Sequence, residues 1–187
     1  MKYMAEEMER NAALQVAALM TAAIRTAPKA CGVDTLETII LDGEEKDALA
    51  EKMIALADEY GAEFFRRDAA NIKDSVCVVL AGARKSYRGL GSCGFCGKEN
   101  CGEAIKDGVS CAYSGVDLGI AIGSAVAIAS DHHIDNRVMF SAGKAAIEMG
   151  LFSKKTSMAF AIPLSVSKKS IYFDRGIVSA TRPIFPD

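Results

Sequence analysis

The 187-residue chain contains only two histidines, and this scarcity limits the chemistry that it can perform. Histidine is the side chain most often used as a general acid or base near neutral pH, so little acid–base machinery is available. Neither the G-x-S-x-G pattern of serine hydrolases nor the H-E-x-x-H pattern of zinc peptidases occurs in the sequence. A hydrolase is therefore the least favoured class of enzyme.

A basic excess and a long hydrophobic run are also missing. The formal net charge of −2 and the pI near 5.8 argue against a nucleic-acid-binding surface. The longest apolar stretch, residues 116–130, is shorter than the ~20 residues that span a bilayer, and it includes Asp117. The N-terminal residues lack the apolar core of a signal peptide. We therefore expect a cytoplasmic protein that binds neither nucleic acid nor membranes.

Four of the six cysteines gather in one glycine-rich stretch, residues 82–111. They follow the spacing C-x2-C-x4-C-x9-C, as Cys93, Cys96, Cys101 and Cys111. Seven of the sixteen glycines lie in the same stretch, and glycine allows the tight loops that point backbone N–H groups at sulfur. Five basic and three acidic side chains leave an excess of +2, which could offset the −2 of four thiolates around a 2+ core.

This spacing favours an iron–sulfur cluster over zinc. Structural zinc sites usually combine two C-x2-4-C knuckles or include histidine, whereas this stretch has one knuckle followed by single cysteines. Clusters commonly take three close cysteines and a fourth farther along the chain. We predict a [4Fe–4S] cluster on the four cysteines and keep zinc as the alternative. Disulfides rank last because nothing indicates an oxidising compartment. Cys77, in an apolar strand, and Cys31, in a loop, are predicted not to be ligands.

Hydrophobic periodicity predicts a mixture of helices and strands. Helices are expected at residues 4–27, 44–60, 114–130 and 136–149, and strands at residues 36–41, 76–81, 158–164 and 171–173. Residues 76–81 are apolar without alternation, which indicates a strand buried on both faces. The cysteine-rich stretch would then follow a central strand. A capping box, Ser114 to Asp117, is expected to open the third helix.

That third helix carries a stripe of small residues spaced four apart. Its members are Gly115, Gly119, Gly123 and Ala127. Each glycine costs a helix ~1 kcal/mol relative to alanine, so something must approach this face closely. A crossing element of the chain's own core, a subunit interface and a flat cofactor are three interpretations that remain open.

Two groups of motifs resemble known families. AALMTAAIRTAPKACGVDTLETIIL and the following EEKDALAEKM resemble the opening of the nitroreductase-like flavoproteins, and SGVDLGIAIGSAVAIAS and AFAIPLSVSKKSIYFDR resemble their small-residue-rich helix and late strand. The cysteine-rich stretch is foreign to ordinary nitroreductases. APKACGVD, GSCGFCG and DHHIDNR are similar to a family of uncharacterised bacterial and archaeal proteins that contain a ferredoxin domain. The resemblance implies a single α+β domain over residues 1–187, with nitroreductase-like helices around a central sheet and a Gly/Cys-rich metal-binding insert at about residues 82–112.

The nitroreductase resemblance also implies a homodimer with FMN bound between the subunits. Arg10, Lys29 and Arg175 are the candidates for binding this cofactor, and we expect a flavin-sized cleft beside Lys29 and Arg175. Lys29, Gly32 and Asp34 stand where the family usually has other polar loop residues. An ordinary solvated charge is the alternative interpretation of each of the three basic residues.

Two functions follow from these patterns. One is an iron–sulfur redox protein that transfers electrons, with a flavin-linked reductase of a small substrate as its enzymatic form. The alternative is a non-catalytic binding or structural module in which zinc or a structural cluster holds a long loop together.

Overall fold

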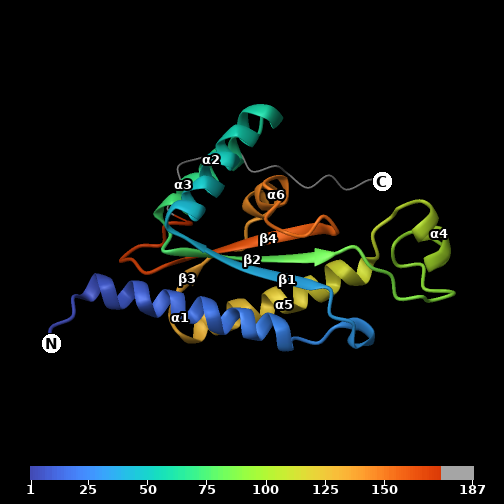
Figure 1. The fold of residues 1–187 in the computed structure, drawn as a ribbon, viewed down its shortest axis with the longest axis horizontal. Helices are drawn as coiled ribbons and strands as arrows, with labels where there is room; N and C mark the ends of the chain where they lie inside the picture. Colours follow the sequence, from blue (N-terminus) through green and yellow to red (C-terminus); the bar gives the residue numbers. More distant parts are fainter. Residues whose placement is uncertain (174–187) are drawn as a thin grey trace.

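The computed structural model describes residues 1–173 and has a four-stranded antiparallel sheet at its centre, in the order β1-β2-β4-β3 (Figure 1). The strands are β1 (Leu36–Asp42), β2 (Cys77–Arg84), β3 (Asp135–Asn136) and β4 (Thr156–Ser165). The helices are α1 (Ala5–Thr26), the 3-10 turn η1 (Ala30–Gly32), α2 (Gly43–Tyr60), α3 (Glu63–Asp74), α4 (Cys101–Lys106), α5 (Ala112–Asp131) and α6 (Phe140–Glu148). The expected α+β class, with helices around a central sheet, is confirmed.

Helices cover both faces of the sheet, with α1 and α5 on one side and α2, α3 and α6 on the other (Figure 1). Val79 and Ala81 of β2 pack in the core beneath α1 and α5. Val78 and Leu80, which point to the opposite face, pack in the core beneath α2, α3 and α6. Because successive side chains of a strand alternate between faces, a strand covered twice is apolar throughout. All of β2 except Arg84 is buried, as predicted for a central strand.

Helix α3 is an element that the periodicity did not predict. Its sequence reads as a charged passage, but Phe65, Ala69 and Ile72 recur at helical spacing and are buried against the core. The charged residues between them hide this narrow apolar stripe.

Two predicted elements are wrong near the C-terminal end of the sheet. Helix α6 begins at Phe140 rather than at residue 136, because Asp135–Asn136 pair with β4 as the short strand β3. Residues 171–173 form a turn rather than a strand beside β4. On the edge of β4 opposite β2, Leu164 and Ser165 pair with β3 and Ala161 forms a bridge with Met139, so the end of β4 that leads into residues 171–173 is already paired.

Helix α5 is longer than its apolar stretch indicated, because it begins at Ala112 with Cys111 as its N-cap residue. Ser114 and Asp117 lie inside the helix and are buried, so the predicted capping box is wrong. By length and composition alone, the 20-residue helix could cross a membrane, although 39% of its most apolar window is buried inside the protein. In the structure, α5 forms a layer against α1 and the sheet (Figure 1).

Candidate metal centre

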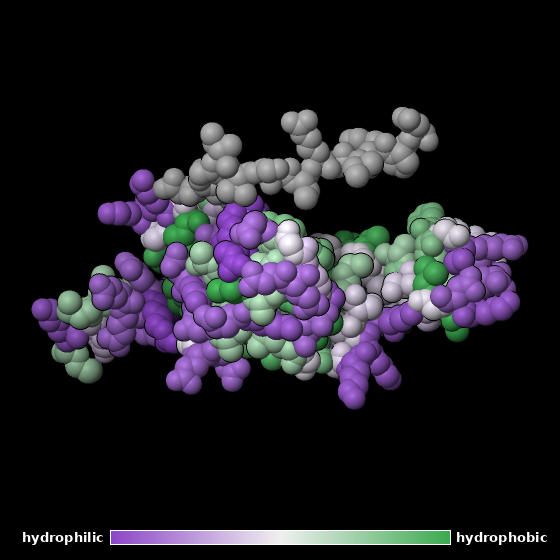
Figure 2. All heavy atoms as spheres, turned by 90° about the horizontal axis from the view of Figure 1, so that it is seen from above, coloured by the Kyte–Doolittle hydropathy of each residue, from purple (hydrophilic) through white to green (hydrophobic). Residues whose placement is uncertain are grey.

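The cysteine-rich stretch forms a lobe that projects from the end of the sheet where β2 finishes (Figure 1). Hydrophobic and hydrophilic residues lie side by side on the surface of this lobe (Figure 2). Gly89, Gly94, Gly97 and Gly108 have φ values of 73°, 76°, 77° and 69°. Residues with a side chain rarely adopt this left-handed backbone conformation, so glycine is required for these turns. The Gly97 N–H donates to the Gly94 carbonyl at 2.9 Å and closes the C-x2-C loop.

The fold brings the four predicted ligands around one pocket. Cys93, Cys96, Cys101 and Cys111 all lie in its wall. Cys111 is buried, and the other three are half-buried. Because these residues come from a loop, from the start of α4 and from the N-cap of α5, the chain must fold back on itself to bring the sulfurs to one pocket.

The two remaining cysteines lie elsewhere in the fold, and their assignment as non-ligands stays a prediction. Cys77 pairs with Asp42 and Leu164 in the sheet and is completely buried. Burial raises the pKa of its thiol to about 12, so it is protonated at neutral pH. Cys31 is exposed in η1 with a φ of 58°.

Backbone geometry in the pocket suits sulfur that carries negative charge. The Leu90 N–H donates to the Cys101 sulfur at 3.3 Å, and the Cys101 N–H returns a bond to the Leu90 carbonyl at 3.1 Å. Asn100 caps the start of α4 by accepting the Glu103 N–H at 3.0 Å. Cys111 stands at the N-cap of α5, where the helix dipole favours an anion.

All four cysteines line the same pocket. Within residues 1–173, no three His, Cys, Asp or Glu side chains converge closely enough to hold a single metal ion. Tetrahedral zinc with Zn–S bonds of ~2.3 Å requires sulfurs ~3.8 Å apart. A multi-iron cluster holds one thiolate on each corner iron and therefore keeps them farther apart. Four thiols in the wall of one pocket are a donor set that suits a cluster, and three closely spaced cysteines with a fourth farther along are typical of one.

Of the five basic residues in the stretch, Arg88 and Lys98 line the pocket, and each is paired with a carboxylate. Lys98 contacts Asp107 at 2.7 Å, and this hydrogen bond raises the pKa of the Lys98 ammonium. Arg88 contacts Asp117 at 2.5 Å. In the sequence, Arg88 contributes only to the net charge of the stretch, and Asp117 only to the predicted capping box and to the argument against a membrane span. Asp117 is a lone acidic residue in an otherwise apolar helix. Because a buried charge needs a partner, this could have indicated that a basic residue such as Arg88 pairs with it.

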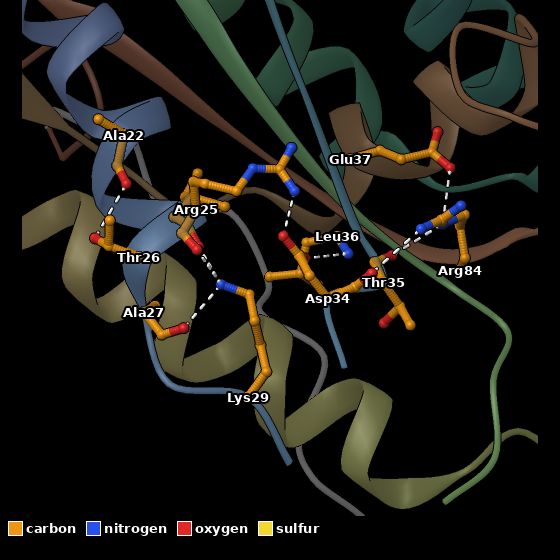
Figure 3. A network of polar contacts seen from close by, with 11 residues as sticks. Ala22, Arg25, Thr26, Ala27, Lys29, Asp34, Thr35, Leu36, Glu37 and Arg84 are labelled. Carbon is orange, nitrogen blue, oxygen red and sulfur yellow. Dashed lines mark hydrogen bonds and ion pairs between the residues drawn. The ribbon is translucent and has the colours of Figure 1, made fainter. Parts of the chain in front are cut away.

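Within one subunit, Arg10 and Lys29, two of the three candidate flavin-binding residues, do not lie in one site. Lys29 donates through Nζ to the carbonyls of Ile24, Arg25 and Ala27 at 2.7, 2.7 and 2.8 Å and so satisfies the end of α1 (Figure 3). Arg10 forms an exposed ion pair with Asp42 at 2.5 Å. Since most of α1 separates them, Arg10 and Lys29 lie ~24 Å apart along the helix axis. Arg175 lies outside the described residues.

A second pocket nevertheless lies beside Lys29. Its wall is mainly apolar and consists of Pro28, Lys29, Ala30, Tyr113, Val116, Asp117 and Ile120. Tyr113 also lines the cysteine pocket, where its ring stacks with Phe95 at 5.8 Å between centroids. The two pockets are therefore neighbours that share one aromatic wall.

The small-residue stripe of α5 faces outward over part of its length. An added Cβ at Gly119 or Gly123 meets no described heavy atom within 4 Å. Val116 and Ile120 on the same side are 51% and 42% exposed. Among residues 1–173, no element of the chain's own core crosses these two glycines, and the interpretations of a subunit interface and a flat cofactor remain.

Comparison with known proteins finds similarity to a ferredoxin-domain family and to solved nitroreductase structures. A family described as "Uncharacterized protein containing a ferredoxin domain (DUF2148)" matches residues 107–175, which include Cys111 but not the other three pocket cysteines. An uncharacterised protein of Archaeoglobus fulgidus is 41% identical over 176 residues, covering 89% of this chain and 94% of the relative. The relationship covers most of both chains.

Solved structures share the fold at low sequence identity. The nitroreductase CinD from Lactococcus lactis, in complex with nicotinic acid, superposes with a TM-score of 0.59 and 14% identity over 90% of this chain and 84% of its own. The FMN-dependent nitroreductase NfnB from Mycobacterium smegmatis, in complex with NADPH, has a TM-score of 0.57 and 11% identity, with 89% and 84% covered. The nitroreductase-like fold expected from the sequence is thereby confirmed, and the chain belongs to the family of uncharacterised proteins that contain a ferredoxin domain.

Proposed function

We propose that this protein is an iron–sulfur redox protein in which Cys93, Cys96, Cys101 and Cys111 hold a [4Fe–4S] cluster. The observation that carries the proposal is the single pocket lined by all four cysteines. The ferredoxin-domain family and the nitroreductase fold both support a redox role. A cluster in this pocket would supply one-electron transfer.

The chain's own residues would hold and protect such a centre. The four thiolates would bind it, and the Leu90 N–H already donates to the Cys101 sulfur, as backbone amides do around cluster sulfurs. The Phe95 and Tyr113 rings, stacked in the wall, would limit the access of water on their side. Phe95 is 72% exposed, so this side of the pocket also offers a surface at which an electron donor could dock.

We further propose that the pocket beside Lys29 receives a planar redox partner, with FMN as the first candidate. Its apolar wall and the Tyr113 ring that it shares with the cysteine pocket would set a flat molecule next to the centre. The similar NfnB is FMN-dependent, which supports this choice. Because Lys29 Nζ is engaged with three carbonyls, a flavin phosphate would have to be bound by other groups.

A homodimer is part of the same proposal. The exposed side of α5 presents Val116 and Ile120 beside two glycines over which nothing described lies. Small residues let helix backbones approach closely, and burying the adjacent apolar side chains would stabilise the pair. A second copy of α5 is therefore the occupant proposed for this face.

Anaerobic purification followed by iron, acid-labile sulfide and zinc analysis tests the metal centre. We expect about four irons and about four sulfides per chain, as a [4Fe–4S] cluster requires, and an EPR signal on reduction. A colourless, zinc-replete preparation would contradict the proposal and would favour the structural module. Titration of FMN into the cluster-loaded protein tests the second pocket, and the absence of saturable binding would remove flavin from the proposal.

A further inference from the structure

Arg88 is buried deep between the cysteine pocket and α5. Its side chain is 1% exposed, and that of its partner Asp117 is 3% exposed. Nη2 donates to Asp117 Oδ2 at 2.5 Å, and Nη1 donates to Ser86 Oγ at 2.7 Å. Asp117 Oδ1 accepts the Ala30 N–H at 3.0 Å, so the carboxylate is held from two sides. The guanidinium is therefore fixed in one orientation.

One nitrogen of this fixed guanidinium makes no hydrogen bond. The Nε–H is buried and has no acceptor among the described residues. A buried N–H without an acceptor is costly, and native proteins rarely retain one without a ligand, water or ion to receive it. An arginine carries five donors, so the two bonds that hold Arg88 in place do not account for the choice of this residue.

The cysteine pocket offers the missing acceptor. Arg88 lines this pocket together with all four cysteines. We propose that the Arg88 Nε–H donates to a sulfur of the iron–sulfur centre proposed above, and that Asp117 positions the guanidinium to do so. The inference rests on the proposed function, since it needs a sulfur-bearing centre in the pocket.

The bond would give Arg88 a redox role that a purely structural ion pair lacks. Reduction adds one negative charge to the centre, and a neighbouring guanidinium with an N–H···S bond stabilises that charge. Arg88 would therefore raise the reduction potential of the centre. The negative charge of Asp117 would make this increase in potential smaller. Asp117 also accepts the Ala30 N–H, and both residues line the pocket beside Lys29.

Pulsed EPR of the intact protein tests the bond directly. The protein is produced with arginine that carries nitrogen-15 at Nε, purified without air and reduced. We expect a nitrogen-15 hyperfine coupling to the cluster that persists in Arg84→Lys and disappears in Arg88→Lys. A cluster signal without any arginine coupling in the wild type would overturn the inference and leave the proposed function intact. A preparation without iron would overturn both.

Redox titration of two double variants supplies a second readout. In each variant, both members of one ion pair are replaced by neutral amides. Arg88→Gln with Asp117→Asn removes the buried pair, and Arg84→Gln with Glu37→Gln removes the more exposed pair whose atoms lie 3.5 Å apart. We expect the first variant to lower the equilibrium constant for one-electron reduction at least tenfold, which is about 59 mV, and the second to leave it unchanged. Equal potentials in a folded, cluster-bearing first variant would contradict the inference. If that variant does not fold, the labelled wild type still decides.

Discussion

The carboxylate of Asp117 accepts the backbone N–H of Ala30, 87 positions earlier in the chain, at 3.0 Å. Its other oxygen accepts from Arg88, 29 positions earlier, at 2.5 Å. One residue of α5 therefore ties down both the loop after α1 and the start of the cysteine-rich lobe. Because its side chain is 3% exposed, water cannot replace either partner.

Asp117→Asn should destabilise the protein strongly. The substitution leaves the Arg88 charge buried without a counter-charge, and breaking a buried pair in this way costs about 3–5 kcal/mol. Urea unfolding of the metal-free protein measures the change. Asp58→Asn, which removes an exposed partner of Arg66, is the control and should have little effect. Equal losses of the free energy of unfolding in the two variants would show that the buried pair stabilises the protein no more than the exposed one.

Serine substitution should separate the four pocket cysteines from the other two. Any one of Cys93, Cys96, Cys101 and Cys111 changed to Ser should abolish or strongly deplete the iron centre. Cys77→Ser and Cys31→Ser should retain it, because these residues lie in the sheet and in η1. Iron and sulfide content per folded chain is the measurement, with circular dichroism as the check on folding. Loss of iron from a folded Cys77→Ser protein would contradict the assignment.

Leucine at both Gly119 and Gly123 should yield a folded monomer. The added side chains meet nothing described within 4 Å of the new Cβ atoms, so the isolated subunit should tolerate them. Replacing each glycine should even favour the helix by ~1 kcal/mol. The bulk would instead prevent close approach of a second α5. Sedimentation measures the state, with Ala48→Leu plus Ala55→Leu on the exposed side of α2 as the control expected to stay dimeric.

A leucine variant that remains dimeric would place the subunit interface elsewhere. One that unfolds would contradict the open environment of the two glycines.

Gly143→Ala should destabilise the domain. Helix α6 packs so closely on β4 that an added Cβ would lie 2.1 Å from the Ala159 carbonyl oxygen and 2.6 Å from the Phe160 Cα. Backbone atoms cannot move aside as a flexible side chain can, so we expect a cost of about 1–3 kcal/mol or more. Gly91→Ala, at a position where an added Cβ meets nothing described within 4 Å, is the control and should have little effect. Thermal or urea unfolding of both variants measures the pair.

Cys77 should make the stability of the protein depend on alkaline pH. Burial raises the pKa of its thiol from 9.0 to about 12, so the unfolded chain releases this proton well before the folded one does. The contribution is complete below about pH 9 and is lost as the pH rises toward 12, with a slope of at most ~1.4 kcal/mol per pH unit. Urea unfolding of the wild type and Cys77→Ala across this range gives the difference between their free energies of unfolding. The titration of lysines and tyrosines, which both proteins share, cancels in this difference. Parallel curves would contradict the shift.

Local patterns were sufficient to predict much of this protein from its sequence. The unbroken apolar run of β2 predicts a strand buried twice, because only such a strand has no polar face. Cysteine spacing selects four thiols out of six, because a tight loop of glycines brings close neighbours together whatever the rest of the chain does. Helix α3 was missed since its narrow stripe of Phe65, Ala69 and Ile72 is diluted by charge.

Tertiary structure alone decided which groups face each other across long separations. Spacing shows that Gly119 and Gly123 share one side of a helix, but only the packing of α5 on α1 shows that this side is left open. The composition contains an arginine and an aspartate, but their burial as a pair depends on how the lobe folds back over α5. Lys29 resembles a ligand-binding residue in the sequence and satisfies the carbonyls at the end of α1 in the fold. A side chain's partners are set by distance in space, and a periodic pattern carries information only about the few residues on either side of it.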